Sequence, residues 1–288
     1  MTTLTPPPLP PAPTTPTPPA PQERPPHPAA RVVAILAIVF GGLIVLGAAT
    51  AAIIGGLAAA AVHTETRTVT ADGIADLDID VSAGEVVLEY GDVDDVTLEV
   101  TSSRGADAWT LERDGDTLTV QTPNGFFGFG WIFGGNGRAV ITLPAEYESR
   151  TLDAALDLSA GDLTVSGTFG DLKTTVSAGS LDVEGSASSL QTDVSAGSAD
   201  LAVSGVADAD LAVSAGELIV ALTERAPRDV VLDVSAGSLT LTVPDGTYDV
   251  NVSVSAGELH NHLDTSSTAT STITGEVSAG DAVLRAGR

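Results

Sequence analysis

The chain has 288 residues, with 38 aspartates and glutamates against 12 lysines and arginines, and a formal net charge of −26 at pH 7. This excess of acid repels phosphate backbones and anionic lipid head groups, so it excludes nucleic-acid binding. The chain contains no cysteine, which excludes disulfides, thiolate metal sites and cysteine nucleophiles.

Residues 1–31 form a proline-rich segment that holds 13 of the 17 prolines. Proline has no amide donor and a fixed φ, so this segment predicts a disordered, flexible tail without helix or sheet. Such a tail can dock onto an aromatic groove of a partner. No specificity residues flank the prolines, however, and we interpret the tail as a solvated spacer.

Residues 32–62 carry no charged side chain and are long enough to cross a bilayer, which needs roughly 20 residues. The alternative is a cleaved secretory signal peptide, whose apolar region is usually only about 7–15 residues long, and we favour a retained transmembrane helix. Arg24 and Arg31 precede the span, and the positive-inside tendency therefore predicts a cytoplasmic N-terminus. We expect a single-pass protein of the cell membrane, with the lipid bilayer around residues 32–62 and an extracytoplasmic C-terminal domain.

Residues 64–150 are expected to form the strand-rich N-terminal part of this domain, with hairpins or irregular coils. Within it, the glycine-rich loop 125–137 contains five aromatic residues, Phe126, Phe127, Phe129, Trp131 and Phe133. Exposed aromatics of this kind are typical of a contact patch for a membrane, a glycan or a protein. The loop could equally fold over the end of the following domain as a cap, and both interpretations stay open.

Ser-Ala-Gly occurs eight times, and from residue 161 onward the spacing of its glycines is 18 to 23 residues. A unit this short cannot bury a core alone, so each copy must stack on its neighbours as one coil of a solenoid. Residues 151–288 are therefore predicted to form an all-β solenoid. The corner glycines are Gly84, Gly161, Gly179, Gly197, Gly216, Gly237, Gly257 and Gly280.

Four columns of the repeat predict which side chains point inward. The residues seven and three positions before the glycine, and two and four positions after it, are apolar in every copy except at Asn261. Between them stand mainly Ser, Thr, Asp and Glu, with the period of two that is typical of a strand with one buried face. Each coil is therefore expected to consist of strands.

The inward positions are an odd number of residues before the glycine and an even number after it. The alternation of inward and outward side chains therefore shifts by one residue at Ala-Gly, which indicates an extra residue there and hence a corner or bulge. We expect glycine at this corner because it tolerates positive φ, and we expect the preceding alanine to be a small inward filler. A Gly197→Val substitution is expected to damage one corner and to loosen two neighbouring coils.

The residues directly after the glycines are expected to point outward and to stack into a partly acidic ladder. Like charges about 5 Å apart cost on the order of 1 kcal/mol per pair in water, so either solvent screens them or a hard cation such as calcium binds. No calcium-loop signature occurs, and we favour a screened face with at most weak calcium binding. The members of this ladder are Glu85, Asp162, Ser180, Ser198, Glu217, Ser238, Glu258 and Asp281.

His260 and His262 flank Asn261 and are expected to point outward together. Asp264 is the only close third ligand, so we interpret them as surface histidines rather than as a metal site. Asn261 needs a hydrogen-bond partner if it is buried. Arg285 and Arg288 are expected to discourage edge-to-edge addition at the end of the stack.

The sequence contains no nucleophile elbow, phosphate loop, zinc signature or acid/base pair that would mark an active site. We therefore expect no catalytic residues, no cofactor and no enzymatic activity.

The strand ending in Ile141-Thr-Leu-Pro144 is followed by repeats of the form Leu-x-Val-Ser-Ala-Gly-[Ser/Asp/Glu]-Leu-x-Val. With the single span before it, this arrangement resembles the bacterial putative-adhesin β-strand-repeat family, which is related to the toastrack domains of unknown function. The resemblance covers about residues 66–288, and Ser-Ala-Gly stands where that family usually has Ser-Gly-Asp. It implies a right-handed parallel β-helix and an envelope location, and it offers no catalytic residues.

We therefore hypothesise a membrane-anchored, adhesin-like binding or structural module of the cell envelope. Its partner would be an envelope protein or a cell-wall polymer. An alternative is an envelope-stress sensor or scaffold that signals through its cytoplasmic tail. A weaker alternative is a polysaccharide-active β-helix enzyme, but such sites use basic residues and Lys173 is the only lysine.

Overall fold

The computed structural model describes residues 63–102, 106, 109–122 and 137–287. The predicted tail (1–31), the predicted span (32–62), the five aromatic residues of the predicted contact loop and Arg288 lie outside the described residues. Within the described part, no helix is long and apolar enough to cross a membrane.

The described part consists of strands joined by turns, with one short 3-10 helix, η2 (Ala145–Ser149). The predicted all-β class is therefore confirmed. In chain order the strands are β1 (His63–Val69), β2 (Asp76–Val81), β3 (Glu85–Gly91), β4 (Val96–Ser102), β5 (Thr110–Asp114), β6 (Thr117–Gln121), β7 (Arg138–Pro144), β8 (Thr151–Leu158), β9 (Asp162–Val176), β10 (Ser180–Val194), β11 (Ser198–Ser204), β12 (Asp208–Val213), β13 (Glu217–Thr223), β14 (Asp229–Val234), β15 (Ser238–Pro244), β16 (Thr247–Val254), β17 (Glu258–Asn261), β18 (Asp264–Thr265), β19 (Ser271–Val277) and β20 (Asp281–Gly287).

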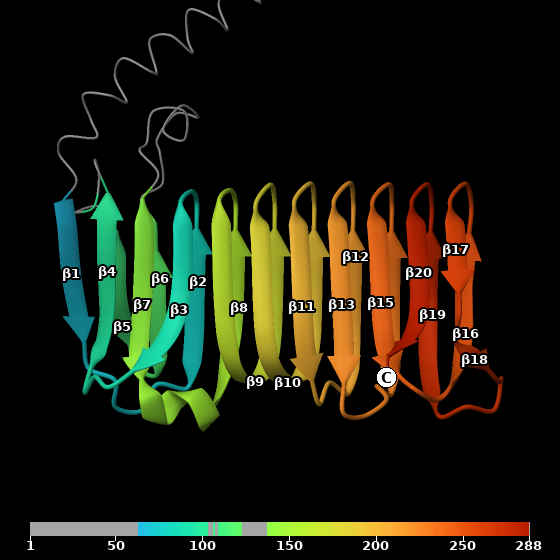
Figure 1. Cartoon of the computed structure of the whole chain (residues 1–288), viewed down its shortest axis with the longest axis horizontal. Coiled ribbons are helices and arrows are strands. Elements are labelled where there is room, and N and C mark those ends of the chain that lie inside the picture. Colours follow the sequence, from blue (N-terminus) through green and yellow to red (C-terminus); the bar gives the residue numbers. More distant parts are fainter. Residues whose placement is uncertain (1–62, 103–105, 107–108, 123–136, 288) are drawn as a thin grey trace, which may run out of the picture. The chain divides into compact units, whose positions relative to one another are not determined.

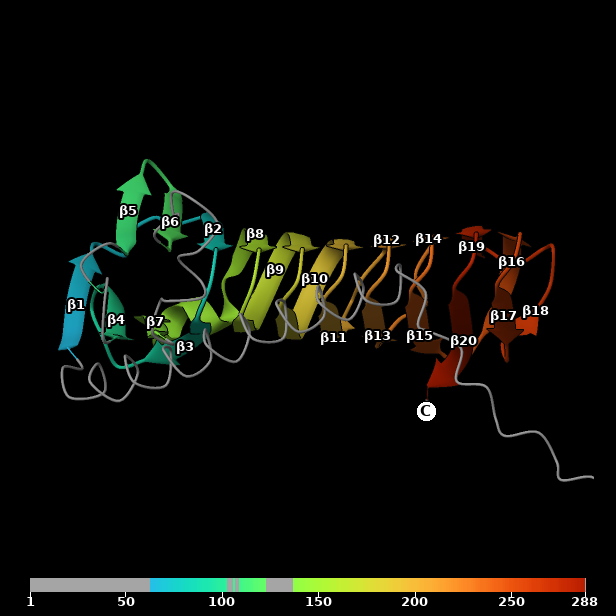
Figure 2. The same cartoon turned by 90° about the horizontal axis from the view of Figure 1, so that it is seen from above.

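Each coil of the solenoid has two arms, which form two layers (Figures 1 and 2). We call the layer whose strands run toward the Ser-Ala-Gly corner the ascending sheet; its order is β6-β2-β8-β9-β10-β12-β14-β19-β16. The layer that leaves the corner is the descending sheet, in the order β7-β3-β9-β10-β11-β13-β15-β20-β17. All these neighbours are parallel. The long strands β9 and β10 contribute their first halves to the descending sheet and their second halves to the ascending one.

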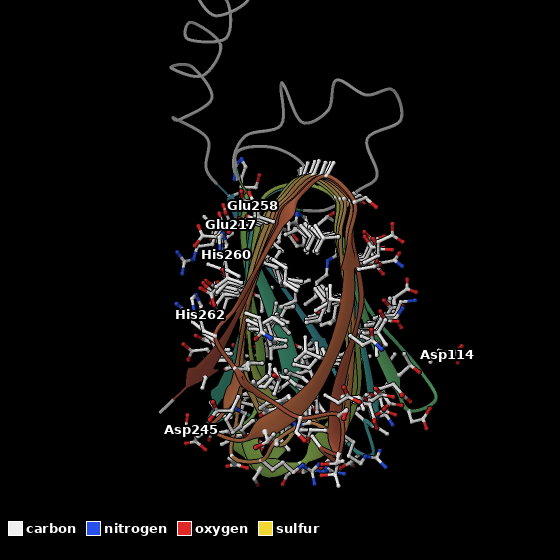
Figure 3. The ribbon with its side chains drawn as sticks, turned by 90° about the vertical axis from the view of Figure 1, so that its right-hand side faces the viewer. Asp114, Glu217, Asp245, Glu258, His260 and His262 are labelled. Atoms are coloured by element: carbon white, nitrogen blue, oxygen red, sulfur yellow. The ribbon has the colours of Figure 1, made fainter. Side chains whose placement is uncertain are left out.

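The space between the two sheets is filled by apolar side chains, as the view along the solenoid shows (Figure 3). One continuous core extends from Ala71 to Leu284 and is made mainly of Leu, Val and Ile. The core residues and strand ladders of the described part lie within residues 63–287, so the fragment 63–288 keeps all the packing that the structure describes.

The four predicted inward columns are buried in every coil but one. The exceptions are Val250, Val254, Leu259 and Asn261, and all four belong to the coil formed by β16 and β17. Elsewhere the column positions are at most 5 % exposed, whereas Val254 is 42 % exposed. The departure has a topological cause, which is the order of the coils.

The last coil in the sequence is not the last coil in the stack. Strand β19 lies between β14 and β16, and β20 lies between β15 and β17. The coil of Gly257 is therefore terminal, and the coil of Gly280 returns to lie inside it (Figure 1). The N-terminal end has the same feature, because β6 and β7 lie outside β2 and β3. A terminal coil has only one covered side, which explains the exposure of Val254 and the polar Asn261 in an inward column.

The expected role of Arg285 is wrong for the same reason. It lies on β20, the penultimate descending strand, and its Nε donates a hydrogen bond to Thr242 Oγ1 on β15 at 2.8 Å. The side chain therefore lies along the flank of the stack and does not guard its end.

The corner glycines form a ladder along the stack, and in every coil but the terminal one, that of Gly257, the glycine carbonyl accepts a hydrogen bond from the next coil. Glu217 N, for example, donates to Gly197 O at 3.0 Å, and Ser198 N donates to Gly179 O at 2.9 Å. Among the eight corner glycines, φ lies in the left-handed region only at Gly84 and Gly161. A Cβ would lie between 1.9 and 2.8 Å from the carbonyl oxygen of the neighbouring glycine at all eight corners. Close backbone approach is therefore the general reason for glycine here, and positive φ applies at two corners.

The alanine before each glycine does not fill the interior, as we had expected. It is exposed in six of the eight copies and half-exposed at Ala83 and Ala160. The chain turns outward at the corner, so the alanine methyl groups face solvent while the apolar residues three positions before the glycine close the core beneath them. Small size is needed because the corner backbones of adjacent coils lie in hydrogen-bond contact, as in Ala215 N to Ser195 O at 2.8 Å.

The variation in repeat length is absorbed at the edge opposite the corner. The two 18-residue repeats bend there within single strands, β9 and β10. Longer repeats insert residues 205–207, 224–228 and 262–270 there, the last of which includes β18, between strands that stay in register. The inward columns are thus preserved in spite of insertions.

Antiparallel strands close the N-terminal end. Strand β4 pairs antiparallel with β7, β1 with β4, and β5 with β6. Trp109, just before β5, is 4 % exposed and packs in the core. This end is therefore covered, unlike the end formed by β16 and β17.

Candidate functional site: the acidic outer faces

The charged side chains of the described part lie on the outside of the two sheets, and none of these residues is fully buried. Five polar residues are buried, all of them serines or threonines: Ser102, Thr122, Thr174, Thr192 and Ser271. Thr174 Oγ1 donates to Thr192 Oγ1 at 3.0 Å across two coils. Any interaction through charged groups must therefore use the outer faces.

The residues directly after the corner glycines stack in register on the descending sheet, as the repeat predicts. In space the order runs Arg138, Glu85, Asp162, Ser180, Ser198, Glu217, Ser238, Asp281 and Glu258. Two acids are adjacent only at Glu85–Asp162 and Asp281–Glu258. Arg138 Nη1 lies 2.9 Å from Glu85 Oε1, and Ser198 Oγ donates to Ser180 Oγ at 3.4 Å. Serines and one arginine thus separate most of the charges.

A second and more acidic column lies on the ascending sheet, eight residues before each glycine. The sequence analysis did not predict this column, because it considered only the outward residues directly after the glycine. The Asp that recurs eight residues before the glycine was the available signal. In space it reads Thr117, Asp76, Asp153, Asp171, Ser189, Asp208, Asp229, Thr272 and Asp249.

Hydrogen bonds to the next coil hold several of these aspartates. Asp153 Oδ1 accepts from the backbone N–H of Asp171 at 2.8 Å, and Asp171 Oδ1 accepts from Ser189 Oγ at 2.6 Å. Arg228 forms an ion pair with Asp208. These three carboxylates therefore stabilise the stack as well as giving the face its charge.

Two aspartates on the outer faces have a raised pKa, because their surroundings disfavour the ionised carboxylate. Burial raises the pKa of Asp200 above its usual value, and the carboxylates of Asp182 and Glu217 raise it further. Burial also raises the pKa of Asp80, with smaller contributions from Asp157 and Asp78. A raised folded-state pKa means that ionisation opposes folding, so the penalty acts at pH above that pKa and disappears as the pH falls through it.

Replacing Asp200 by asparagine is therefore expected to stabilise the protein at neutral pH, by about 0.5 kcal/mol or less because the side chain is exposed to solvent. Urea unfolding at neutral pH and at a pH below the carboxyl range measures the difference. The same variant at acid pH is its own control, because both side chains are then neutral. A gain that persisted undiminished at acid pH would contradict the electrostatic explanation.

The two histidines lie on the outer side of the terminal coil with Glu258 (Figure 3). His260 Nε2 lies 3.2 Å from Glu258 Oε2, and both side chains are more than half exposed. Asn261 is also exposed, and its Oδ1 accepts the backbone N–H of Leu263 at 2.9 Å. Within the residues that the structure covers, no group of three or more His, Asp or Glu side chains is placed to hold a metal ion.

The aromatic residues of the predicted contact loop lie outside the described residues, so their role remains a prediction. The structure describes where the segment joins the solenoid. Gly137 occupies the corner position of the coil formed by β6 and β7, where its carbonyl accepts Glu85 N at 2.9 Å. In the sequence, residues 123–136 come between β6 and Gly137, where the repeats have only the Ser and Ala of Ser-Ala-Gly before the glycine.

These features define a class of protein: a parallel β-solenoid with an apolar interior and columns of acidic side chains on its outer faces. The family model for the Toastrack DUF4097 domain matches residues 74–287, and the chain belongs to this family. The resemblance inferred from the Ser-Ala-Gly repeats is confirmed.

Several solved structures are similar to this chain at low identity. A putative adhesin from Parabacteroides distasonis is 13% identical, with 78% of this chain and 97% of that one covered and a TM-score of 0.43. A putative adhesin from Bacteroides fragilis is 14% identical, with 78% of this chain and 97% of that one covered and a TM-score of 0.42. A putative lipid-binding protein from Parabacteroides distasonis is 15% identical, with 77% of this chain and 96% of that one covered and a TM-score of 0.39. No protein with a curated description matches.

Proposed function

We propose that this chain is an adhesin-like binding module of the bacterial cell envelope, anchored in the membrane by residues 32–62 with the solenoid on the extracytoplasmic side. The observation that carries the proposal is the separation of apolar from charged side chains in the solenoid. Its interior is filled with apolar side chains, and its carboxylates are ordered in columns on two outer faces. Such a surface suits binding along its length, and we propose no catalytic role.

The charge of the surface restricts its partner. Columns of carboxylates repel other anionic polymers and attract groups that carry protonated amines or bridging cations. The apolar run at residues 32–62, with Arg24 and Arg31 before it, supports the anchor and its orientation.

Co-sedimentation of purified residues 63–288 with isolated cell walls and with membranes tests the proposal, with and without calcium. We expect the fragment to bind one of the two materials. A variant with serine at Phe126, Phe129 and Trp131 should lose this binding if the loop is the contact, and keep it if the acidic faces are. No binding by the wild-type fragment would contradict the adhesin-like function and favour a sensor or scaffold that acts through residues 1–31.

A further inference from the structure

The terminal coil leaves open strand edges on both sheets at one end of the stack. Strand β18 pairs with the outer side of β16 at Thr247 and Tyr248 only, and β17 pairs only with β20. Asp249–Val254 of β16 and all of β17 therefore have no strand on their outer side in the described part of the chain. Open edges with apolar side chains are sites where another strand pairs.

The apolar side chains at this edge are partly uncovered. Val254 is 42 % exposed, and Val250, Val252 and Leu259 are only partly buried although their side chains face the interior. Burying them would complete the core in the way that each internal coil completes the core of its neighbour. The end view shows this coil nearest the viewer, with His260 and His262 on its outer side (Figure 3).

We infer that this edge binds the same edge of a second copy, giving a twofold dimer in which both sheets continue across the interface. Strands β16 and β17 run in opposite directions in the two sheets. A twofold axis parallel to them and lying between the copies places β16 of one copy against β17 of the other, and the two strands are then antiparallel. One symmetry operation thus covers both open strands, whereas a single extended peptide would cover only one.

The lengths of the strands fit this arrangement. The open stretch of β16 has the six residues 249–254, and β17 has four residues. Strand β18 occupies the remaining two positions of the same edge, at the end away from the corner. The β17 strand of the second copy therefore lies beyond β18 on the same edge without overlapping it.

The outward side chains also fit. With inward residues opposite inward residues, the register pairs Ser253 with Glu258, Asn251 with His260 and Asp249 with His262 of the other copy, and no two acids face each other. The outward residues of β16 are Asp249, Asn251 and Ser253, so this strand presents a single acid to the second copy. Salt screens the more distant charges of the two copies.

Sedimentation velocity on residues 63–288 over a wide range of concentration tests this inference. The wild-type fragment should form a dimer, and Val254→Glu should be monomeric because it would bury a carboxylate in the interface. Val231→Glu is the matched control: Val231 is 43 % exposed but lies on the outer face of β14 inside the stack. It should dimerise like the wild type, and circular dichroism should show that both variants are folded.

A charge exchange tests the register separately. His262→Asp places two acids together at two symmetry-related positions and should weaken the dimer about tenfold. Asp249→His combined with His262→Asp should restore it. A monomeric wild type at all concentrations, or a dimer that Val254→Glu leaves intact, would overturn the inference. It does not depend on the proposed binding to walls or membranes, which is measured on a different material.

Discussion

Gly197→Ala is expected to lower the free energy of unfolding by about 3 kcal/mol or more, although it adds a single methyl group. The new Cβ would lie 2.3 Å from Gly179 O and 2.7 Å from Val176 Cγ1. The backbone must move apart to make room, and Gly179 O is the acceptor for Ser198 N. Overpacking in a close-packed region costs typically about 1–3 kcal/mol, and each buried polar group left unpaired adds about 1–3 kcal/mol.

Gly246→Ala is the matched control, because it is the same chemical change in a turn at the opposite edge. A Cβ there has its nearest neighbour, Tyr248 Cε2, at 3.6 Å, which is ordinary contact. This variant should match the wild type or be slightly more stable, since alanine reduces the freedom of the unfolded chain. Urea unfolding followed by circular dichroism measures both. Equal stability of the two variants would show that the corner backbones are not packed as closely as the structure indicates.

The Ser-Ala-Gly corner was predicted from the sequence only in part. The fixed column of glycines predicted a bend at each Ala-Gly, and the bend is there. The physical reason could not be read from spacing alone, because positive φ and close backbone approach both select glycine. Only coordinates show that the neighbour of Gly197 is the carbonyl of Gly179, and that the alanine before each glycine faces solvent.

The order of the coils could not be predicted from the repeat. All copies present the same inward columns, so any coil fits against any other, and sequence order was the natural expectation. Two signals were nevertheless present. Asn261 places an amide in an inward column, which suits a terminal coil, and the spacing of 23 residues between Gly257 and Gly280 is the longest from Gly161 onward and supplies the connection that carries the chain back past the terminal coil.

The outer faces were predicted in part. The ladder after the glycines follows from the register of the stack, because in-register parallel coils must align equivalent positions. The column of aspartates on the ascending sheet follows from the same logic but was not noticed. Its hydrogen bonds, such as Asp153 with the N–H of Asp171, depend on the local bend within β9 and need coordinates.

Leu239→Ala and Leu259→Ala test the coil order, because the two leucines stand at the same position of the repeat. Leu239, on β15, is fully buried between β13 and β20, whereas Leu259, on β17, is only partly buried. The first substitution should cost about 2–5 kcal/mol, since it leaves a cavity enclosed on all sides. The second should cost about 1 kcal/mol, since solvent and neighbouring side chains can fill the space at an open edge.

The measurement is urea unfolding of both variants, at concentrations where the protein is monomeric so that the edge of β17 is uncovered. If the coils stacked in sequence order, β17 would lie between β15 and β20, and Leu259→Ala would then be as costly as Leu239→Ala. A large difference between the two therefore supports the return of β19 and β20 into the stack. It also supports the open edge at β16 and β17, because the same uncovered side of the coil that makes Leu259 tolerant of truncation is the surface that pairs with a second copy.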